Sequence, residues 1–171
     1  GMWIPLLLKS LNESDMHAMG LRLSAEDIYS INKSSLKDAV VHFGGGCTAE
    51  VVSDQGLILT NHHCGYGQIQ MHSTEENNYL KNGFWAMTNS QELKNKNLTA
   101  TFIVRIEDVT QRILEGITPD MSAEQIAKLK ASNKNNIISS ATKDTHFEAQ
   151  IKPFFYGNEY YMIITETYKD V

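Results

Sequence analysis

The spacing of apolar and polar residues predicts a chain in which helices alternate with antiparallel strands. Apolar residues at helical intervals predict helices over residues 3–19, from residue 24, and over 73–87, 108–117 and 122–140. Runs rich in β-branched or alternating residues predict strands over residues 42–53, entered through the apolar run 39–41, and over 57–60, 98–107, 147–151 and 160–164. Because the strand–helix–strand rhythm of a parallel sheet is missing, the pattern predicts a mixed α/β fold with antiparallel strands and disfavours a Rossmann-type fold.

Two of the predicted helices begin with the residues of a capping box. Ser24 is followed three positions later by Asp27, and Ser122 by Gln125, so each serine can accept a main-chain N–H from the first turn. The predicted helix over 73–87 offers an apolar side that we expect to be buried: Tyr79, Leu80, Phe84 and Trp85. Trp3 is expected in the core as well.

The first predicted hairpin carries both cysteines of the chain, Cys47 and Cys64, which are 17 positions apart. Its strands are residues 42–53 and 57–60, and the turn between them is Asp-Gln-Gly, whose glycine tolerates a positive φ. A hairpin brings Cys64 back toward Cys47, within bridging reach. The spacing alone leaves two readings open: two free thiols, or a disulfide that would indicate an oxidising compartment.

Composition restricts the class of protein. The 171 residues suffice for one ordinary domain or the front part of a larger one, and 42% hydrophobic against 20% charged residues excludes wholesale disorder. The net charge of −5, without a basic cluster, offers no attraction for nucleic acid or anionic lipid. Near the N-terminus the longest apolar run, Ile4 to Leu8, is far below the ~20 residues of a membrane span. No signal-peptide pattern is visible either.

Candidate chemistry is concentrated directly after the second predicted strand, at residues 60–67 (Thr-Asn-His-His-Cys-Gly-Tyr-Gly). A histidine at the end of a rigid strand is well placed to act as a general base, because imidazole titrates near neutral pH. A purely structural histidine is the ordinary alternative. A zinc set of His62, His63, Cys64 and His72 matches no ligand spacing. A nucleophilic Cys64 is disfavoured, because the adjacent His63 cannot easily form the side-chain hydrogen bond that such a pair needs.

Residues 46–64 resemble the histidine-bearing hairpin of chymotrypsin-like serine proteases, in which the base directly precedes a cysteine that bridges back to the preceding strand. The resemblance is closer still to the bacterial periplasmic dipeptidyl-peptidases of the seven and eleven type. It is carried by Gly-Met-Trp-Ile-Pro at 1–5, His-Phe-Gly-Gly-Gly-Cys at 42–47, Thr-Asn-His-His-Cys-Gly-Tyr-Gly at 60–67 and Asn-Gly-Phe-Trp-Ala at 82–86. It is strong to about residue 108 and looser beyond.

This resemblance implies that residues 1–171 are the N-terminal part of a serine-peptidase catalytic domain: part of a chymotrypsin-like (trypsin-type) β-barrel with added helices. It implies removal of dipeptides from peptides with a free N-terminus, by a serine that attacks, a histidine that takes its proton and an aspartate that orients the imidazole. His63 carries over as the base, and Cys47 and Cys64 carry over as a disulfide. His62, its neighbour on the strand, would face the opposite way.

The resemblance also implies a periplasmic, cell-surface or secreted protein whose signal peptide has been removed or is not included, and it implies no cofactor or metal. The sequence departs from the family in lacking Gly-x-Ser-x-Gly, and its late aspartates lack the family's surrounding motif: Asp108, Asp120, Asp144 and Asp170. We therefore expect an N-terminal piece that is inactive by itself.

Two alternatives to an enzyme remain open. One is a non-catalytic binding or assembly module that kept a protease half-barrel, and the other is a disulfide-stapled structural domain of different ancestry. An incomplete barrel would expose sheet edges and apolar surface, so a homo-oligomer is a further hypothesis.

Overall fold

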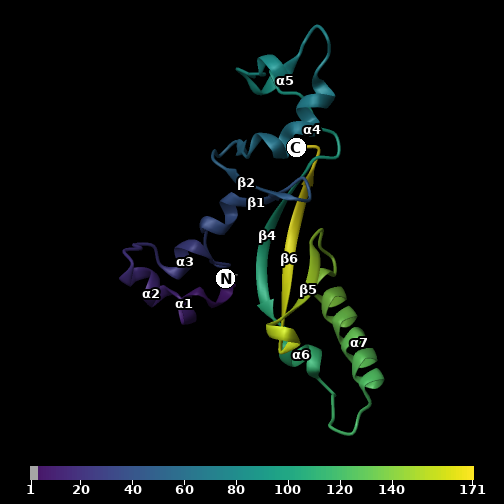
Figure 1. Ribbon diagram of the computed structural model, residues 1–171. Coiled ribbons are helices and arrows are strands. Elements are labelled where there is room, and N and C mark those ends of the chain that lie inside the picture. Colours follow the sequence, from purple (N-terminus) through teal and green to yellow (C-terminus); the bar gives the residue numbers. More distant parts are fainter. Residues whose placement is uncertain (1–3) are drawn as a thin grey trace. The chain divides into compact units, whose positions relative to one another are not determined.

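The computed structural model describes residues 4–171, and the chain divides into two compact units (Figure 1). The first comprises Gly1–Lys37 and Ile103–Glu166, and the second comprises Asp38–Phe102 and Thr167–Val171. Both contain helices and strands, so the predicted mixed α/β class with antiparallel strands is confirmed. The expectation for Trp3 falls outside the described residues.

Six strands form one sheet in the order β3-β2-β1-β4-β6-β5. They are β1 (Val40–Phe43), β2 (Cys47–Val51), β3 (Ile58–Leu59), β4 (Thr99–Asp108), β5 (Glu148–Phe154) and β6 (Glu159–Lys169). The pairs β1–β2, β1–β4, β2–β3 and β5–β6 are antiparallel. Strands β3 and β5 are the two edges, so over residues 4–171 the sheet is open rather than closed into a barrel.

The helices are mostly short. They are α1 (Leu8–Leu11), α2 (Glu13–Ala18), α3 (Ala25–Ile28), α4 (His62–His72), α5 (Tyr79–Asn82), α6 (Thr110–Leu114) and α7 (Ala123–Thr142). Single 3-10 turns lie at Pro5–Leu7, Leu36–Ala39, Asn89–Gln91 and Phe155–Gly157. The prediction of one helix over 3–19 is wrong, because Asn12 adopts a non-helical φ of −129° and separates α1 from α2.

The predicted helix over 73–87 is also wrong, since only the four residues of α5 are helical there. Before it, side chains close turns instead: Ser73 Oγ accepts the N–H of Leu80, and Thr74 Oγ1 accepts the N–H of Asn77. After it, Gly83 at φ +73° ends the helix. Asparagine and glycine favour turns and caps over helix interiors, and here they outweigh the apolar spacing.

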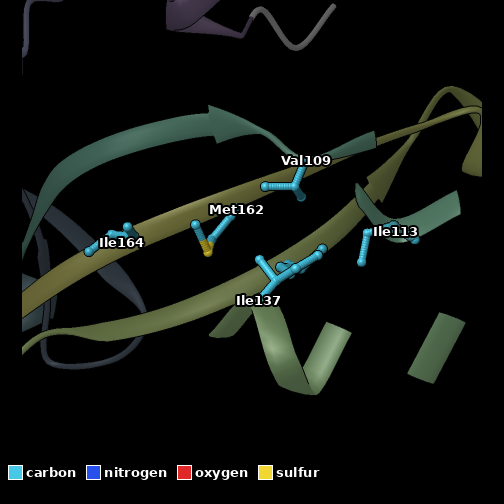
Figure 2. Packing of buried hydrophobic residues seen from close by; sticks show 6 residues of the cluster. Val109, Ile113, Ile137, Met162 and Ile164 are labelled. Carbon is cyan, nitrogen blue, oxygen red and sulfur yellow. The ribbon is translucent and has the colours of Figure 1, made fainter. Parts of the chain in front are cut away.

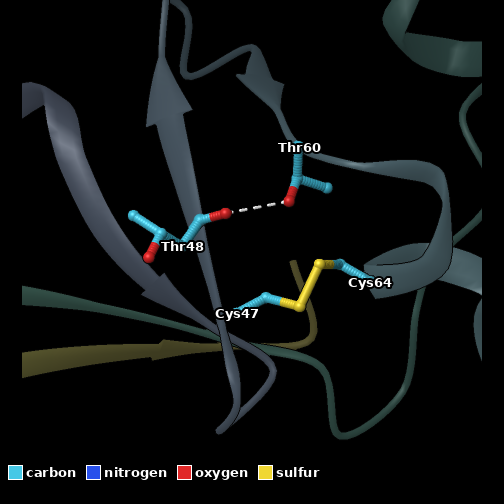
Figure 3. Close-up of a disulfide and its surroundings, with 4 residues drawn as sticks. All are labelled: Cys47, Thr48, Thr60 and Cys64. Atoms are coloured by element: carbon cyan, nitrogen blue, oxygen red, sulfur yellow. Dashed lines mark hydrogen bonds between the residues drawn. A yellow bond between two sulfur atoms is a disulfide. The ribbon is translucent and has the colours of Figure 1, made fainter.

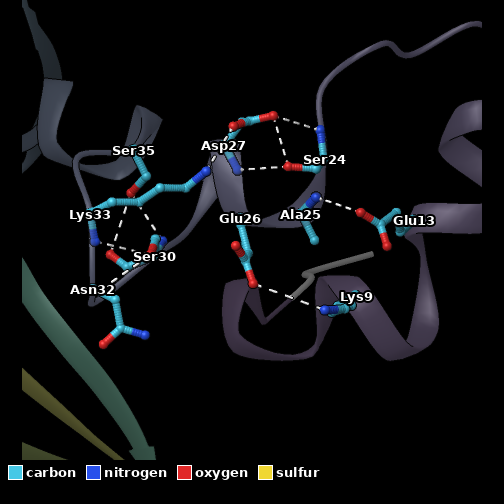
Figure 4. A network of polar contacts seen from close by, with 10 residues as sticks. All are labelled: Lys9, Glu13, Ser24, Ala25, Glu26, Asp27, Ser30, Asn32, Lys33 and Ser35. Carbon is cyan, nitrogen blue, oxygen red and sulfur yellow. Dashed lines mark hydrogen bonds and ion pairs between the residues drawn. The ribbon is translucent and has the colours of Figure 1, made fainter.

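Both predicted capping boxes are confirmed, at Ser24–Asp27 and Ser122–Gln125. Around the first box, a network of polar contacts holds the N-terminal helices (Figure 4). Asp27 also pairs with Lys33 at 3.3 Å, and Glu13 accepts the N–H of Ala25 at 2.7 Å. These contacts join segments that contain few buried apolar residues.

The core of the first unit lies between α6, α7 and the β5–β6 hairpin. Its buried residues are Val109, Ile113, Ile137, Ile151, Met162 and Ile164, most of them labelled in Figure 2. The amide of Asn133 on α7 donates to the carbonyls of Ile113 and Glu115, which ties α6 to α7. Nearby, burial and the adjacent Glu159 carboxylate raise the pKa of the Tyr161 hydroxyl.

The second unit has its own core, made by one face of β1, β2 and β4. Its buried residues are Val41, Phe43, Ala49, Leu98 and Ala100, and the half-buried Cys47 and Cys64 pack against them. The segment that carries the predicted chemistry is therefore built directly onto this core.

Candidate functional site

The β2–β3 hairpin positions the candidate site. Glu50 pairs with Leu59 and Val51 with Ile58, and the turn between the strands is closed by the Ser53 hydroxyl, which accepts the N–H of Leu57. Gly56 adopts φ +84°, a left-handed conformation in which a side chain would be strained. The turn thus forms where the sequence predicts it, with the glycine where the turn needs it. The prediction of one strand over residues 42–53 is wrong, because a turn at residues 44–46 divides this stretch between β1 and β2.

A disulfide joins the hairpin to the helix that follows it (Figure 3). Cys47 lies at the start of β2 and Cys64 in the first turn of α4, with their Cα atoms 6.0 Å apart. Of the two readings left open by the spacing, the structure has the disulfide, and within residues 4–171 no free thiol is present. The start of α4 is therefore covalently attached to the sheet.

The two histidines lie on a helix, which corrects the expectation that they end a strand. β3 stops at Leu59, Asn61 is the N-cap residue in an extended conformation, and His62 and His63 are the first two residues of α4. Neighbours on a helix are separated by about 100° rather than by the 180° of a strand. The two rings thus leave the helix in different directions, and the ring of His62 lies edge-on to Tyr66 with centroids 5.9 Å apart.

The imidazole of His63 is exposed, close to the disulfide. Its nearest ring nitrogen and the sulfurs of Cys47 and Cys64 lie within 4.8 Å of one another, the one group of three potential metal ligands in the described chain. Both sulfurs are oxidised, so they are not available as thiolate ligands. His72 is elsewhere, bonded to the Asn95 side chain at 3.2 Å. The structure thus does not gather the set His62, His63, Cys64 and His72.

Within residues 4–171, the structure gives the His63 ring no hydrogen bond or ion pair. Both ring nitrogens are therefore open to further partners. An exposed imidazole at a fixed main-chain position can exchange a proton with a group brought to it, which is the elementary requirement for a general base.

Two cavities of the second unit lie near this segment, although neither is lined by His63. One, of about 530 Å³, is lined by the inner face of α4 and by α5. It contains Gln68, whose Oε1 atom is buried without a hydrogen-bond partner, and the His72–Asn95 pair. The other, of about 650 Å³, lies beside the hairpin turn and Thr60. Sequence reasoning missed both. The α4 residues that line the first cavity include only one apolar side chain, Ile69, so they give no apolar stripe, and the second cavity is lined by residues far apart in the sequence.

The aromatic residues of the 82–86 motif are not where they were expected. Trp85 is 83% exposed and Phe84 46% exposed, so the prediction that they are core residues is wrong. Phe84 instead packs on Tyr79 at a centroid distance of 4.9 Å. Met87 is also exposed, and Phe84 and Met87 each line one of the two cavities.

The family described as Peptidase S46 matches residues 1–171, the full length of the chain. The chain belongs to this family. An Asp/Glu-specific dipeptidyl-peptidase of Capnocytophaga gingivalis is 53% identical over the whole chain, and the dipeptidyl-peptidase 7 of the same organism is 46% identical. The chain spans about a quarter of the length of these curated relatives, 24% in each case.

Solved structures of the family have the same fold. The crystal structure of Porphyromonas endodontalis DPP11 superposes with a TM-score of 0.81 at 40% identity, covering 99% of this chain and 24% of that one. Its complex with the dipeptide Arg-Glu gives a TM-score of 0.79. The resemblance to dipeptidyl-peptidases of the seven and eleven type is thereby confirmed. Among the described residues, no helix combines the length and apolar character that crossing a bilayer requires.

Proposed function

We propose that this chain is the N-terminal part of the catalytic domain of a serine-type dipeptidyl-peptidase. The whole enzyme would hydrolyse peptides two residues from a free N-terminus, so its partners are peptide substrates with that group unblocked. The observation that carries the proposal is the disulfide-anchored His63 in a chain that matches the Peptidase S46 family throughout. The activity of the relatives supports it, and the chain covers about a quarter of their length, 24%.

In this proposal His63 is the general base. It directly precedes Cys64, so the disulfide fixes the main chain next to the imidazole. Its exposure and its open ring nitrogens leave one nitrogen for a serine hydroxyl and the other for an orienting aspartate. The serine and the aspartate would be supplied by the part of the full-length protein that corresponds to the remaining three quarters of the relatives. No step requires a metal or cofactor.

A trypsin-type barrel is part of the same proposal. The strands β1, β2 and β3 form an antiparallel meander that leads directly to the histidine and its disulfide, as the first barrel of such a domain does. The edge strands β3 and β5 present main-chain groups on which further strands could pair and close the sheet. The same edges keep self-association of the isolated chain as a prediction.

For substrate preference we propose an acidic residue at the second position of the peptide. Two relatives that are 53% and 50% identical to this chain are Asp/Glu-specific dipeptidyl-peptidases. The proposed preference rests on the specificity named for those two relatives. A periplasmic or secreted location accompanies the proposal and is supported by the disulfide, which persists in oxidising compartments.

The decisive experiment is an activity assay on the full-length protein. The substrates are dipeptides joined through their C-terminal end to a fluorophore. We expect release of the fluorophore when the second residue is Asp or Glu and slower release when it is Leu. We expect no release when the N-terminus is acetylated. Covalent labelling by a fluorophosphonate would identify a serine nucleophile. An intact, folded protein with no turnover and no labelling would contradict the proposal and favour the non-catalytic module.

A further inference from the structure

The segment that carries both histidines is attached to strand β2 at each of its ends (Figure 3). At the N-terminal end the hydroxyl of Thr60 donates a hydrogen bond to the carbonyl of Thr48, with an O···O distance of 3.0 Å. At the C-terminal end Cys64 forms the disulfide with Cys47. Since Cys47 and Thr48 are consecutive residues, both attachments lie side by side, and only three residues, 61–63, lie between them.

Strand β2 holds these attachments in place because it is hydrogen-bonded to a neighbouring strand along each of its edges. His42 of β1 pairs with Thr48 on one side, and Leu59 of β3 pairs with Glu50 on the other. Ala49, which lies between Thr48 and Glu50 on β2, is completely buried, with 0% of its surface exposed. The β2–β3 ladder ends at Leu59, so the Thr60 hydroxyl prolongs the pairing by one residue at the point where the main-chain ladder stops.

The N-terminus of α4 lacks the side-chain capping hydrogen bond that usually holds the start of a helix. The Thr60 hydroxyl, one residue before the N-cap, is therefore important for fixing this end of the helix. Asn61 is the N-cap residue, but its side chain makes no capping hydrogen bond. The first turn is closed by the N–H of Cys64 bonding to the carbonyl of Asn61 at 2.9 Å. Within the described part of the chain, the loss of the Thr60 bond would leave the disulfide as the remaining side-chain attachment of residues 60–64 to strand β2.

We infer that Thr60 is a positioning residue for His63, acting together with the Cys47–Cys64 disulfide. This inference rests on the proposed role of His63 as the general base. A base must lie within hydrogen-bond reach of its nucleophile, and a displacement of about 1 Å can cost ~100-fold in rate. Anchoring residues 60 and 64 leaves three residues between two fixed points, which restricts where the His63 ring can lie. Thr60 acts through the main chain and does not contact the reacting atoms.

The test uses the full-length enzyme and substitutions that separate the hydroxyl from the shape of the side chain. Thr60→Val removes the donor and keeps the shape, whereas Thr60→Ser keeps the donor. We expect kcat to fall about 10- to 100-fold in Thr60→Val with KM changed less than about twofold, and Thr60→Ser to recover most of the rate. Thr60→Ala provides a second side chain without a hydroxyl in case valine disturbs folding.

The matched control is Thr145→Val. Thr145 is exposed, and its hydroxyl donates to the carbonyl of Thr142 at 2.8 Å and accepts the N–H of Phe147 at 3.2 Å. Thr145→Val therefore loses a bond of the same kind, together with one accepted bond, in the first unit. We expect wild-type kcat from it. Each variant is checked by thermal unfolding and by intact mass for the disulfide. Equal kcat in Thr60→Val and Thr60→Ser, or a loss that only parallels the folded fraction, would overturn the inference.

His63→Ala separates this inference from the proposed function. If His63→Ala retains activity, the role of His63 fails and the role of Thr60 fails with it. If His63→Ala is inactive and Thr60→Val has the wild-type kcat, the general base stands and the positioning role of Thr60 is wrong.

Discussion

The hydroxyl of Tyr29 bonds to both main-chain groups of Ile106, a residue 77 positions away. It accepts the N–H of Ile106 at 2.7 Å and donates to the carbonyl of the same residue at 3.4 Å. Both residues are buried, and Tyr161 and Ile4 pack in the same cluster. The segment after α3 is thus joined to β4 near the C-terminal end of the strand by one side chain, and burial together with the Glu107 carboxylate raises the pKa of the Tyr29 hydroxyl.

We expect Tyr29→Phe to lower the free energy of unfolding by about 1–3 kcal/mol, because it leaves the buried N–H of Ile106 without a partner. Urea unfolding measures the loss in the free energy of unfolding, and faster hydrogen exchange of the Ile106 amide would show that the loss arises at this residue. Tyr156→Phe is the control, since the Tyr156 side chain is fully exposed and should change little. Unchanged exchange at Ile106 would contradict the expectation.

The capping box at Ser24 should make stability depend on pH in the acid range. Hydrogen bonds from the Ser24 hydroxyl and N–H, together with Lys33, lower the pKa of Asp27 to about 2. Because the folded pKa lies below the unfolded value of about 3.9, the ionised carboxylate stabilises the fold above pH ~4. This stabilisation is lost as the pH falls from about 4 to about 2.

Asp27→Asn should therefore melt at a lower temperature than the wild type at pH 7, and the difference should shrink steadily as the pH falls from about 4 to about 2. Melting temperatures across this range test it. The control is Glu75→Gln, because Glu75 is exposed and, in the described chain, has no hydrogen bond or ion pair. A difference that stays constant with pH would show that the Asp27 carboxylate is not the group responsible.

Local chemistry explains which elements the sequence could predict. The capping boxes, the Gly56 turn and the β-branched run of β4 each depend on a few neighbouring residues, and all three are found. The β5–β6 hairpin is found for the same reason. In such elements the local preference and the tertiary structure agree, so pattern reading suffices.

The site itself was harder to predict. His62 and His63 follow an apolar strand, and nothing in the alternation shows that β3 stops at Leu59 and that a helix begins. Asn61, a favoured N-cap residue, was the available signal. The bond from Thr60 to Thr48 joins residues 12 positions apart and depends on the register of the hairpin. Such a contact becomes visible only when the pairing is known.

The disulfide gives a direct prediction about the thiols. Protein made under oxidising conditions should take up no alkylating reagent at Cys47 or Cys64 before reduction and two equivalents after it. Closing a loop of this size should stabilise the fold by about 3 kcal/mol in the chain-entropy description. Intact-mass measurement decides the matter, and two free thiols in the oxidised preparation would contradict the structure.

The 171-residue chain alone should release no dipeptide from a substrate with a free N-terminus. It offers the proposed base, but no Gly-x-Ser-x-Gly occurs in its sequence. Without an activated nucleophile, little catalysis should remain. The assay compares the purified chain with its His63→Ala variant. Turnover that persists in the variant indicates a contaminating peptidase, whereas turnover that disappears in the variant would contradict the prediction.

In the full-length enzyme, replacement of His63 should be far more harmful than replacement of His62. Loss of a triad histidine typically lowers the rate about 10⁴- to 10⁶-fold, because the nucleophile is no longer activated. His63 is adjacent to the disulfide and its ring makes no contact that would occupy its nitrogens in the described chain, whereas the ring of His62 packs against Tyr66. His62→Ala should therefore act mainly through stability.

The measurement is kcat/KM for His62→Ala and His63→Ala, made separately and compared after circular dichroism has shown that both variants are folded. Tyr66→Leu is a useful third variant, because it removes the ring that His62 contacts without touching His63. It should resemble His62→Ala, with a small loss of stability and a kcat/KM close to that of the wild type. If His62→Ala abolishes activity while His63→Ala leaves it largely intact, the base is the first residue of α4 rather than the second, and the alignment of this segment with the histidine hairpin of serine proteases is displaced by one residue.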